Sequence, residues 1–179
     1  MDDEREDELR RPPPRTLYRP VRLQLKVPGD AVKATISLLQ RAGSRESGVF
    51  WYGERDADGN GLVAYVAAPR QRMSWGNYHV PPDALAEVVN RLSGNWKPLA
   101  QLHSHPGLGV EHSTYDDRMA SSGRALSLVF PFHGRLHSTF PLGVGVHEWQ
   151  DDYWHLLSLE QASRRVVLCE GVVTVDDLR

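Results

Sequence analysis

Apolar and polar positions alternate along this chain in short segments, which predicts many strands and a few helices. A period of two from Val21 to Val27 favours a half-buried strand. The apolar runs Val49–Tyr52 and Leu62–Ala68 flank a turn rich in Asp, Gly and Asn, so they are predicted to pair as a hairpin. Later β segments are predicted at residues 97–103, 125–132, 143–149, 153–159 and 165–175.

Helices are predicted where apolar residues recur every three to four positions. The first covers residues 30–42 with Asp30 as its N-cap, and the second covers residues 81–94, opened by two prolines and ended by a glycine. A short helix is predicted at 113–123, and residues 69–80 have no clear period, which indicates loop or irregular strand. This mixture predicts a single α/β or α+β sandwich, with a mixed β-sheet flanked by helices.

The chain has 179 residues, of which 40% are hydrophobic and 25% charged, and these values suit one globular domain. Residues 1–19 are dense in charge and proline, so they are predicted to form a flexible leader that does not join the core. The domain itself is predicted to cover residues 20–179.

Charge and cysteine content argue against several classes of protein. The formal net charge is −2 and no basic run is interleaved with aromatic residues, so neither nucleic acid nor an anionic membrane is expected as a partner. No segment approaches the roughly 20 apolar residues that span a bilayer, and the N-terminus lacks a signal-peptide pattern. The single cysteine cannot form an internal disulfide. We therefore expect a cytoplasmic protein, whose oligomeric state the sequence leaves open.

The stretch that carries chemistry is His103-Ser104-His105-Pro106, followed after six residues by Ser113-Thr114-Tyr115-Asp116-Asp117. Side chains alternate along a strand, so His103 and His105 are predicted to project from the same face. Pro106 ends the strand because it cannot donate to the sheet ladder. The loop that follows lets Asp116 return to the same place, and two imidazoles with one carboxylate can chelate one metal ion.

Such a donor set indicates a catalytic zinc site rather than a structural one. Three protein ligands leave a fourth position open on a tetrahedral zinc ion, whereas a structural site fills all four. A water at that position has its pKa lowered to roughly 7 and still needs a base. The leading candidate for that base is Glu46, which lies between a predicted helix and the strand Val49–Tyr52.

Each part of this pattern has a plainer interpretation when it is taken alone. Ser113-x-x-Asp116 is also a helix N-cap with an acid at the third helical position. A His-x-His pair on a strand is more often a surface or packed pair, and Glu46 is simply a charge at a helix end. All of them together at these spacings favour the metal site, and the cap is compatible with it because a capped helix holds Asp116 in place.

These residues resemble the JAMM motif of the MPN+ (JAB-domain) zinc metalloproteases, and the chain is similar to the prokaryotic members of that family. Glu46 and the segment Ser47–Gly53 look like the upstream glutamate segment, and the resemblance covers roughly residues 21–159. It implies the MPN fold, a cytidine-deaminase-like sandwich. It also implies that His103, His105 and Asp116 bind Zn²⁺, with Glu46 as general acid/base.

The resemblance assigns further roles by position. Ser113 would donate to the oxygen of the tetrahedral intermediate. Trp75, Tyr78 and His79 lie in a region that can grip the tail of a substrate, although aromatic residues there can equally cap the core. Asp117 either orients a metal ligand or interacts with the helix dipole. The neighbouring His112 could support a metal ligand or face solvent, and the prediction is that it faces solvent.

The implied activity is hydrolysis of a peptide or isopeptide bond after the C-terminus of a ubiquitin-like protein. That would place the protein in deconjugation or precursor processing, in antiviral defence or in a sulfur-carrier pathway. A non-catalytic MPN-type interaction module is the main alternative, but such relatives lose metal ligands that this chain retains. A zinc deaminase would pair a histidine with cysteine ligands, which one distant cysteine does not supply.

Overall fold

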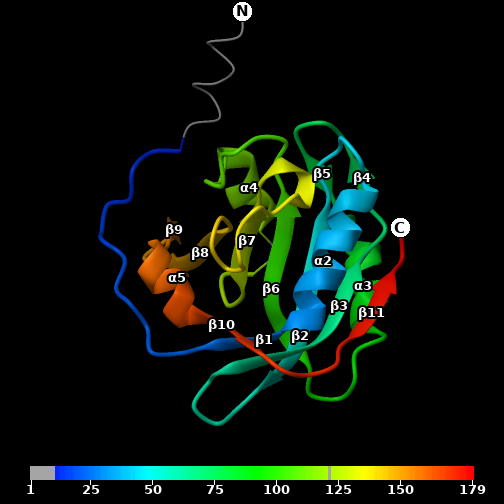
Figure 1. Ribbon diagram of the computed structural model, residues 1–179, viewed down its shortest axis with the longest axis horizontal. Helices are drawn as coiled ribbons and strands as arrows, with labels where there is room; N and C mark the ends of the chain where they lie inside the picture. Colours follow the sequence, from blue (N-terminus) through cyan, green and yellow to red (C-terminus); the bar gives the residue numbers. More distant parts are fainter. Residues whose placement is uncertain (1–10, 121) are drawn as a thin grey trace, which may run out of the picture.

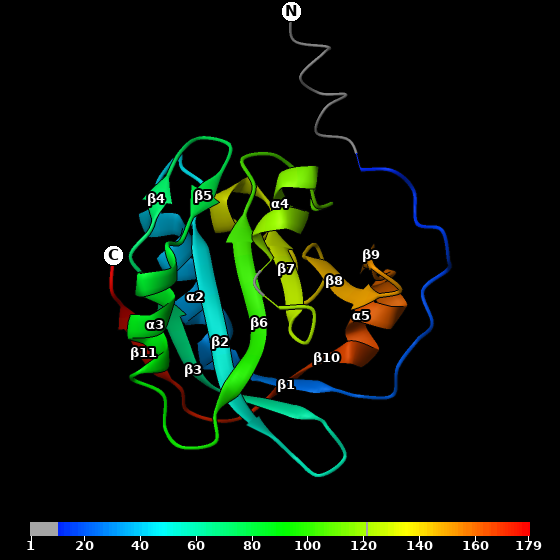
Figure 2. The ribbon, with the colours of Figure 1, turned by 180° about the vertical axis from the view of Figure 1, so that it is seen from behind.

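The computed structural model describes residues 11–120 and 122–179, which form one curled sheet with helices on both faces (Figures 1 and 2). The helices are α2 (Gly29–Arg41), α3 (Pro82–Val89), α4 (Thr114–Met119), α5 (Leu159–Arg165) and the 3₁₀ turn η1 (Phe132–Gly134). The strands are β1 (Leu25–Pro28), β2 (Gly48–Arg55), β3 (Gly61–Ala68), β4 (Arg72–Met73), β5 (Tyr78–His79), β6 (Lys97–Ser104), β7 (Leu126–Phe130), β8 (Gly145–Gln150), β9 (Tyr153–Leu156), β10 (Val166–Cys169) and β11 (Thr174–Asp177).

Within the described residues, nine strands form the main sheet. Eight of them follow the order β10-β1-β3-β2-β6-β7-β8-β9, and the ninth, β11, pairs with β3 farther along that strand than β1 does. The hairpin β2–β3 is antiparallel, as is the pairing of β2 with β6, whereas β6 and β7 run parallel. Strands β4 and β5 form a separate two-stranded sheet. The central position of β6 places its C-terminal end between two neighbouring strands.

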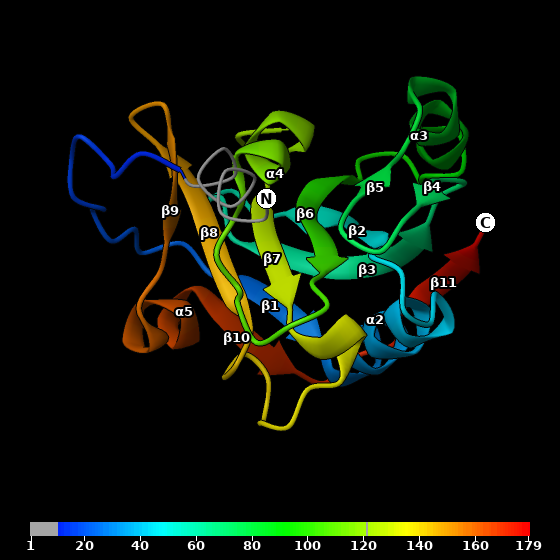
Figure 3. The ribbon, with the colours of Figure 1, turned by 90° about the horizontal axis from the view of Figure 1, so that it is seen from above.

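Both faces of the sheet are buried at β2, which explains its continuous apolar run. Val49 and Trp51 pack in the core that contains residues of α2, and Phe50 and Tyr52 pack in a second core that contains residues of α3. Figure 3 shows α2 and α3 on opposite sides of β2 and β3. The predicted sandwich, a mixed sheet flanked by helices, is therefore confirmed.

Several element boundaries differ from the prediction. The first strand begins at Leu25 rather than at Val21, and Val21 is 38% exposed. The first helix starts at Gly29 with Pro28 at the N-cap position, so Asp30 lies in the first turn instead of capping it. The second helix ends at Val89, before the predicted stop at residue 94.

The largest difference is helix α5, which was not predicted. It begins at Leu159, the residue at which the predicted strand 153–159 was to end. Strand β9 stops at Leu156, and the helix begins after Ser158. The Ser158 hydroxyl accepts a hydrogen bond from the backbone N–H of Gln161, whose side chain accepts one from the Ser158 N–H. This reciprocal capping box satisfies two backbone donors, and it stabilises the helix start at this point.

The predicted leader is only partly described. Residues 1–10 lie outside the described residues, and residues 11–19 form no helix or strand. Residues within 11–19 contact the domain through their side chains. Tyr18 donates from its hydroxyl to Glu148 Oε2 at 2.6 Å, and the Arg11 side chain is only 9% exposed. In the part of the chain that the structure describes, no helix has the length and apolar character needed to span a membrane.

Candidate metal centre and its cleft

His103 and His105 lie at the C-terminal end of β6, on the same face as the two-residue spacing predicts. His103 pairs in register with Gly48 of β2 and Val129 of β7, and its side chain is 2% exposed. The backbone N–H of His105 donates to the carbonyl of Phe130 at 2.8 Å. The surrounding sheet therefore fixes the backbone that presents both imidazoles.

Asp116 reaches the two histidines from α4, and a capping box holds it there. The Ser113 hydroxyl accepts from the Asp116 backbone N–H at 3.2 Å. In return, Asp116 Oδ2 accepts from the Ser113 N–H at 2.7 Å and from the Ser113 hydroxyl at 2.8 Å. Ser113 thus caps the helix while Asp116 faces the histidines, so the two interpretations of Ser113-x-x-Asp116, as a helix cap and as part of a metal site, are compatible.

The three side chains bring their ligand atoms to the spacing of a zinc site. His103 Nε2 lies 3.1 Å from His105 Nε2 and 3.2 Å from Asp116 Oδ1, and His105 Nε2 lies 3.4 Å from Asp116 Oδ2. Ligands about 2.0–2.1 Å from a tetrahedral ion lie roughly 3.3 Å from each other. This buried group can therefore hold a metal ion of that size.

The protonation pattern also suits a cation. His105 Nδ1 lies 3.0 Å from the carbonyl oxygen of Gly109, so Nδ1 carries a proton and Nε2 is the nitrogen that a metal ion would bind. Burial alone would raise the pKa of Asp116, but His103 and the hydrogen bonds to the carboxylate hold it well below its usual range. Asp116 is therefore ionised at neutral pH and supplies the negative charge.

Glu46 lies in the loop between α2 and β2, where it is 5% exposed. Its backbone N–H donates to the carbonyl of Ser74 at 2.8 Å, which ties it to the loop between β4 and β5. Burial raises the pKa of the Glu46 carboxyl to about 7; His105 lowers it and Asp116 raises it further. A carboxyl with a pKa near neutrality is suited to taking and returning a proton.

Glu46, His105 and Asp116 line one cleft of about 470 Å³. Figure 2 shows that α4 and the β4–β5 hairpin lie at the end of the sheet where β6 terminates. Two short loops, 74–77 and 105–113, contribute to the cleft lining, and each contains an exposed glycine. The other lining residues are Trp75, Gly76, Asn77, Pro106, Gly107, Gly109, Ser113 and Tyr115.

The three residues proposed to contact substrate lie in different surroundings. Trp75 is 70% exposed and lines the cleft. Tyr78 is buried with its ring beside His103, and its hydroxyl accepts from Gln101 Nε2 at 2.7 Å, so it packs against His103 within the protein interior. His79 pairs with Arg72 in the β4–β5 hairpin and is absent from the cleft lining. Of these three, only Trp75 is placed to meet a substrate.

The close packing of Tyr78 explains the glycine at position 48. A Cβ added to Gly48 would lie 2.2 Å from Cε2 of the Tyr78 ring. That ring is buried and its hydroxyl is hydrogen-bonded, so it has little freedom to move aside. Gly48 thus permits the aromatic ring to pack between β2 and the first metal ligand.

We predict that Gly48→Ala lowers the free energy of unfolding by about 1–3 kcal/mol, the usual cost of overpacking a core. Gly76→Ala is the matched control, because an added Cβ there meets no atom within 4 Å. Urea unfolding of both metal-free variants measures the difference. Equal stabilities would show that Tyr78 moves aside at little cost.

Sequence analysis was wrong about His112, which is 5% exposed rather than solvent-facing. Its Nδ1–H donates to Asp117 Oδ1 at 2.9 Å, and its Nε2 accepts from the Ser127 hydroxyl at 2.7 Å. Its ring stacks on that of His147, with centroids 3.9 Å apart. Burial is the main factor that lowers the pKa of His112 to about 2, so the ring is neutral in the folded protein.

Asp117 therefore orients His112 instead of a metal ligand, and its other oxygen accepts from Arg11. Sequence reasoning missed both His147 and Arg11. Neither is close in sequence to the motif, and the strand pattern at residues 143–149 gave no reason to single out His147.

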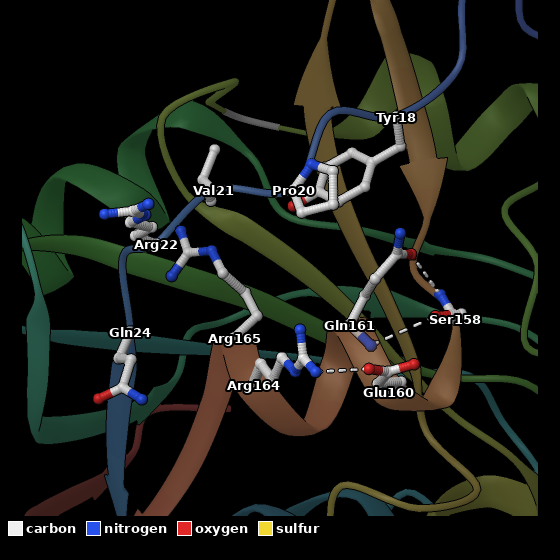
Figure 4. A pocket seen from close by; sticks show the side chains of 10 residues that line it. All are labelled: Tyr18, Pro20, Val21, Arg22, Gln24, Ser158, Glu160, Gln161, Arg164 and Arg165. Atoms are coloured by element: carbon white, nitrogen blue, oxygen red, sulfur yellow. Dashed lines mark hydrogen bonds and ion pairs between the residues drawn. The ribbon is translucent and has the colours of Figure 1, made fainter.

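A second cavity, of about 570 Å³, lies between α5 and the segment that precedes β1. Figure 4 shows Tyr18 and Pro20 on one side, with Arg164 paired to Glu160 on α5. The cavity shares no lining residue with the cleft. Ser158 likewise bonds Gln161. Within the described residues, the cavity lining contains no group of metal-ligating side chains, so the metal group marks the better candidate for a functional site.

This fold and donor group define a JAB-type domain, and comparison with known proteins assigns the family. A family model described as prokaryotic homologs of the JAB domain matches residues 28–149, so the chain belongs to this family. No curated protein matches the chain.

Two solved structures show the same fold. A Desulfitobacterium hafniense protein matches with a TM-score of 0.63 and 18% identity, covering 83% of this chain and 95% of its own. A Salinibacter ruber protein matches with a TM-score of 0.53 and 15% identity, covering 75% of this chain and 89% of its own.

Proposed function

We propose that this protein is a zinc metallopeptidase that hydrolyses a peptide or isopeptide bond after the C-terminus of a ubiquitin-like protein. One observation carries the proposal. His103, His105 and Asp116 hold their ligand atoms 3.1–3.4 Å apart in a cleft that also contains the buried carboxyl of Glu46. Three ligands and an adjacent base match what zinc-dependent amide hydrolysis requires.

Zinc held by these three side chains would polarise the scissile carbonyl and make a water more acidic. Glu46 would take the proton of the attacking water and return it to the leaving amine. Ser113 lies on the cleft wall, although its hydroxyl donates to Asp116 in this structure. A turn of that hydroxyl toward the substrate would let it donate to the developing oxyanion.

The cleft favours a thin, extended substrate chain. Cβ atoms added at Gly76 and Gly107 would meet no atom within 4 Å, so both walls present open backbone to a passing peptide. Trp75 offers an exposed apolar surface beside them. These features fit a glycine-ended tail that enters as an added strand. We place this activity in the cytoplasm, in a deconjugation, defence or sulfur-carrier pathway.

The proposal is tested by elemental analysis of the freshly purified chain, beside a His103→Ala/His105→Ala variant. We expect about one zinc per wild-type chain and none in the variant. Hydrolysis is then measured on ubiquitin-like proteins that end in glycine and carry an aminocoumarin at the C-terminus. Removal of zinc by a chelator should abolish release of the dye, and added zinc should restore it.

Two results would contradict the proposal in different ways. Wild-type protein that neither contains nor takes up zinc would favour a non-catalytic interaction module. Protein that holds zinc yet releases no dye from any glycine-ended ubiquitin-like protein would keep the metal site and reject the substrate class.

A further inference from the structure

The segment of residues 11–24, here called the N-terminal arm, is attached to the domain by its side chains. It contains no helix or strand, and it runs past β9 and α5 before it enters β1 (Figures 1 and 2). Tyr18 bonds Glu148, while Arg19 pairs with Asp151 at 3.0 Å in an exposed position. Figure 4 shows that Tyr18 and Pro20 face α5 across the second cavity.

Arg11 makes a largely buried contact, since its side chain is only 9% exposed. Its Nε donates to Asp117 Oδ2 at 2.7 Å, and its Nη2 donates to the carbonyl of Trp154, also at 2.7 Å. The guanidinium lies 4.3 Å from the centroid of the Tyr153 ring. A charged side chain is rarely buried unless it is paired, and a buried pair costs most when one partner is removed.

The partner of Arg11 lies on the helix that carries a metal ligand. Asp117 follows Asp116 directly on α4, and its second oxygen accepts from His112, which Ser127 of β7 holds in turn. Helix α4 has six residues, and Asp116 is its buried side chain. So short a helix with one buried side chain gains little from apolar packing, and polar contacts such as those of Asp117 fix its position.

We propose that Arg11 is a positioning residue, which holds α4 through Asp117 so that Asp116 stays against His103 and His105. The arm is then part of the metal centre, although Arg11 touches none of the three ligands. The inference rests on the metal-binding half of the proposed function and is independent of the substrate.

The test uses the full chain with Arg11→Ala and, as matched control, Arg19→Ala, which removes another arm-to-domain ion pair of the same chemistry away from α4. Zinc affinity is measured by competition with a chelating dye. Partners that orient metal ligands usually contribute 10–100-fold in affinity, so Arg11→Ala should weaken zinc binding by about tenfold. Arg19→Ala should stay within about twofold of wild type.

Hydrogen exchange of the metal-free proteins gives a readout that needs no zinc. Amides of residues 112–120 should exchange faster in Arg11→Ala and at the wild-type rate in Arg19→Ala. In an Asp117→Asn background, Arg11→Ala should add little, because both changes break one contact.

The outcomes separate this inference from the proposed function. Unchanged exchange in α4 together with unchanged zinc affinity would overturn the positioning role, even if Arg11→Ala lowered the melting temperature by loosening the arm. Faster exchange in α4 of Arg11→Ala, found together with a wild-type chain that binds no zinc, would support the positioning role and reject the proposed function.

Discussion

Replacing Glu46 with glutamine is expected to lower the rate of hydrolysis by about 10²–10⁴-fold while the bound metal stays in place. Glutamine keeps the size of the side chain but cannot take a proton from water. The three ligand atoms belong to His103, His105 and Asp116, so the metal should not depend on Glu46. Two measurements on the same preparation check this prediction. Turnover of the aminocoumarin substrate tests the loss of hydrolysis, and zinc content tests the retention of the metal.

Glu111→Gln is the matched control for this experiment. Glu111 is an exposed carboxylate in the loop between the histidines and α4, so its loss should leave turnover within about twofold of wild type. Loss of zinc from Glu46→Gln would show that Glu46 takes part in binding the metal. Wild-type turnover in Glu46→Gln would show that another group acts as the base.

The metal group was predictable from sequence because its geometry is local. His103 and His105 share a face by strand alternation, and Ser113 caps the helix that carries Asp116 three residues later. These relations need only short-range rules. Glu46 was a candidate base from its place before an apolar strand, and the resemblance to the family supported it. No local rule, however, brings residues so far apart in sequence into one cleft.

The surroundings of the metal group could not be predicted in the same way. The contact between Arg11 and Asp117 joins residues 106 positions apart, and it buries a charge in a segment whose composition indicated a free leader. His112 was predicted to face solvent, because nothing in the sequence around it indicates what would cover its ring. Its burial depends on His147 and Ser127, which come from two other strands.

Some errors in the predicted helix boundaries were avoidable. Helix α5 carries the signature Ser158-x-x-Gln161, which is a capping box, yet the apolar residues before it were extended into one long strand. Leu92 shows a different limit, because this apolar residue at helical spacing suggested a longer helix, whereas α3 ends at Val89. The two capping-box sequences, at Ser113 and at Ser158, each mark a real helix start, whereas the single residue Asp30 did not.

The buried carboxyl of Glu46 has a second consequence, for the stability of the metal-free protein. Burial raises its pKa from 4.5 to about 7, so between these values the folded chain keeps a proton that the unfolded chain has lost. The associated stability is present below pH 4.5 and is lost as the pH rises through about 7. One pKa unit corresponds to about 1.4 kcal/mol, so the change between pH 5 and pH 8 should be about 2–3 kcal/mol.

Glu46→Gln should not show this loss, because glutamine does not titrate. We therefore expect that, with chelator present, the free energy of unfolding of wild type falls relative to Glu46→Gln by about 2–3 kcal/mol from pH 5 to pH 8. Urea unfolding of both proteins at the two pH values gives the difference, and groups common to both, such as His112, largely cancel. A constant difference would mean that Glu46 is already ionised and solvated at pH 5, and its burial would then not explain its fitness as a base. A falling difference would show that the chain gives up stability at this position to keep a proton acceptor beside the metal group.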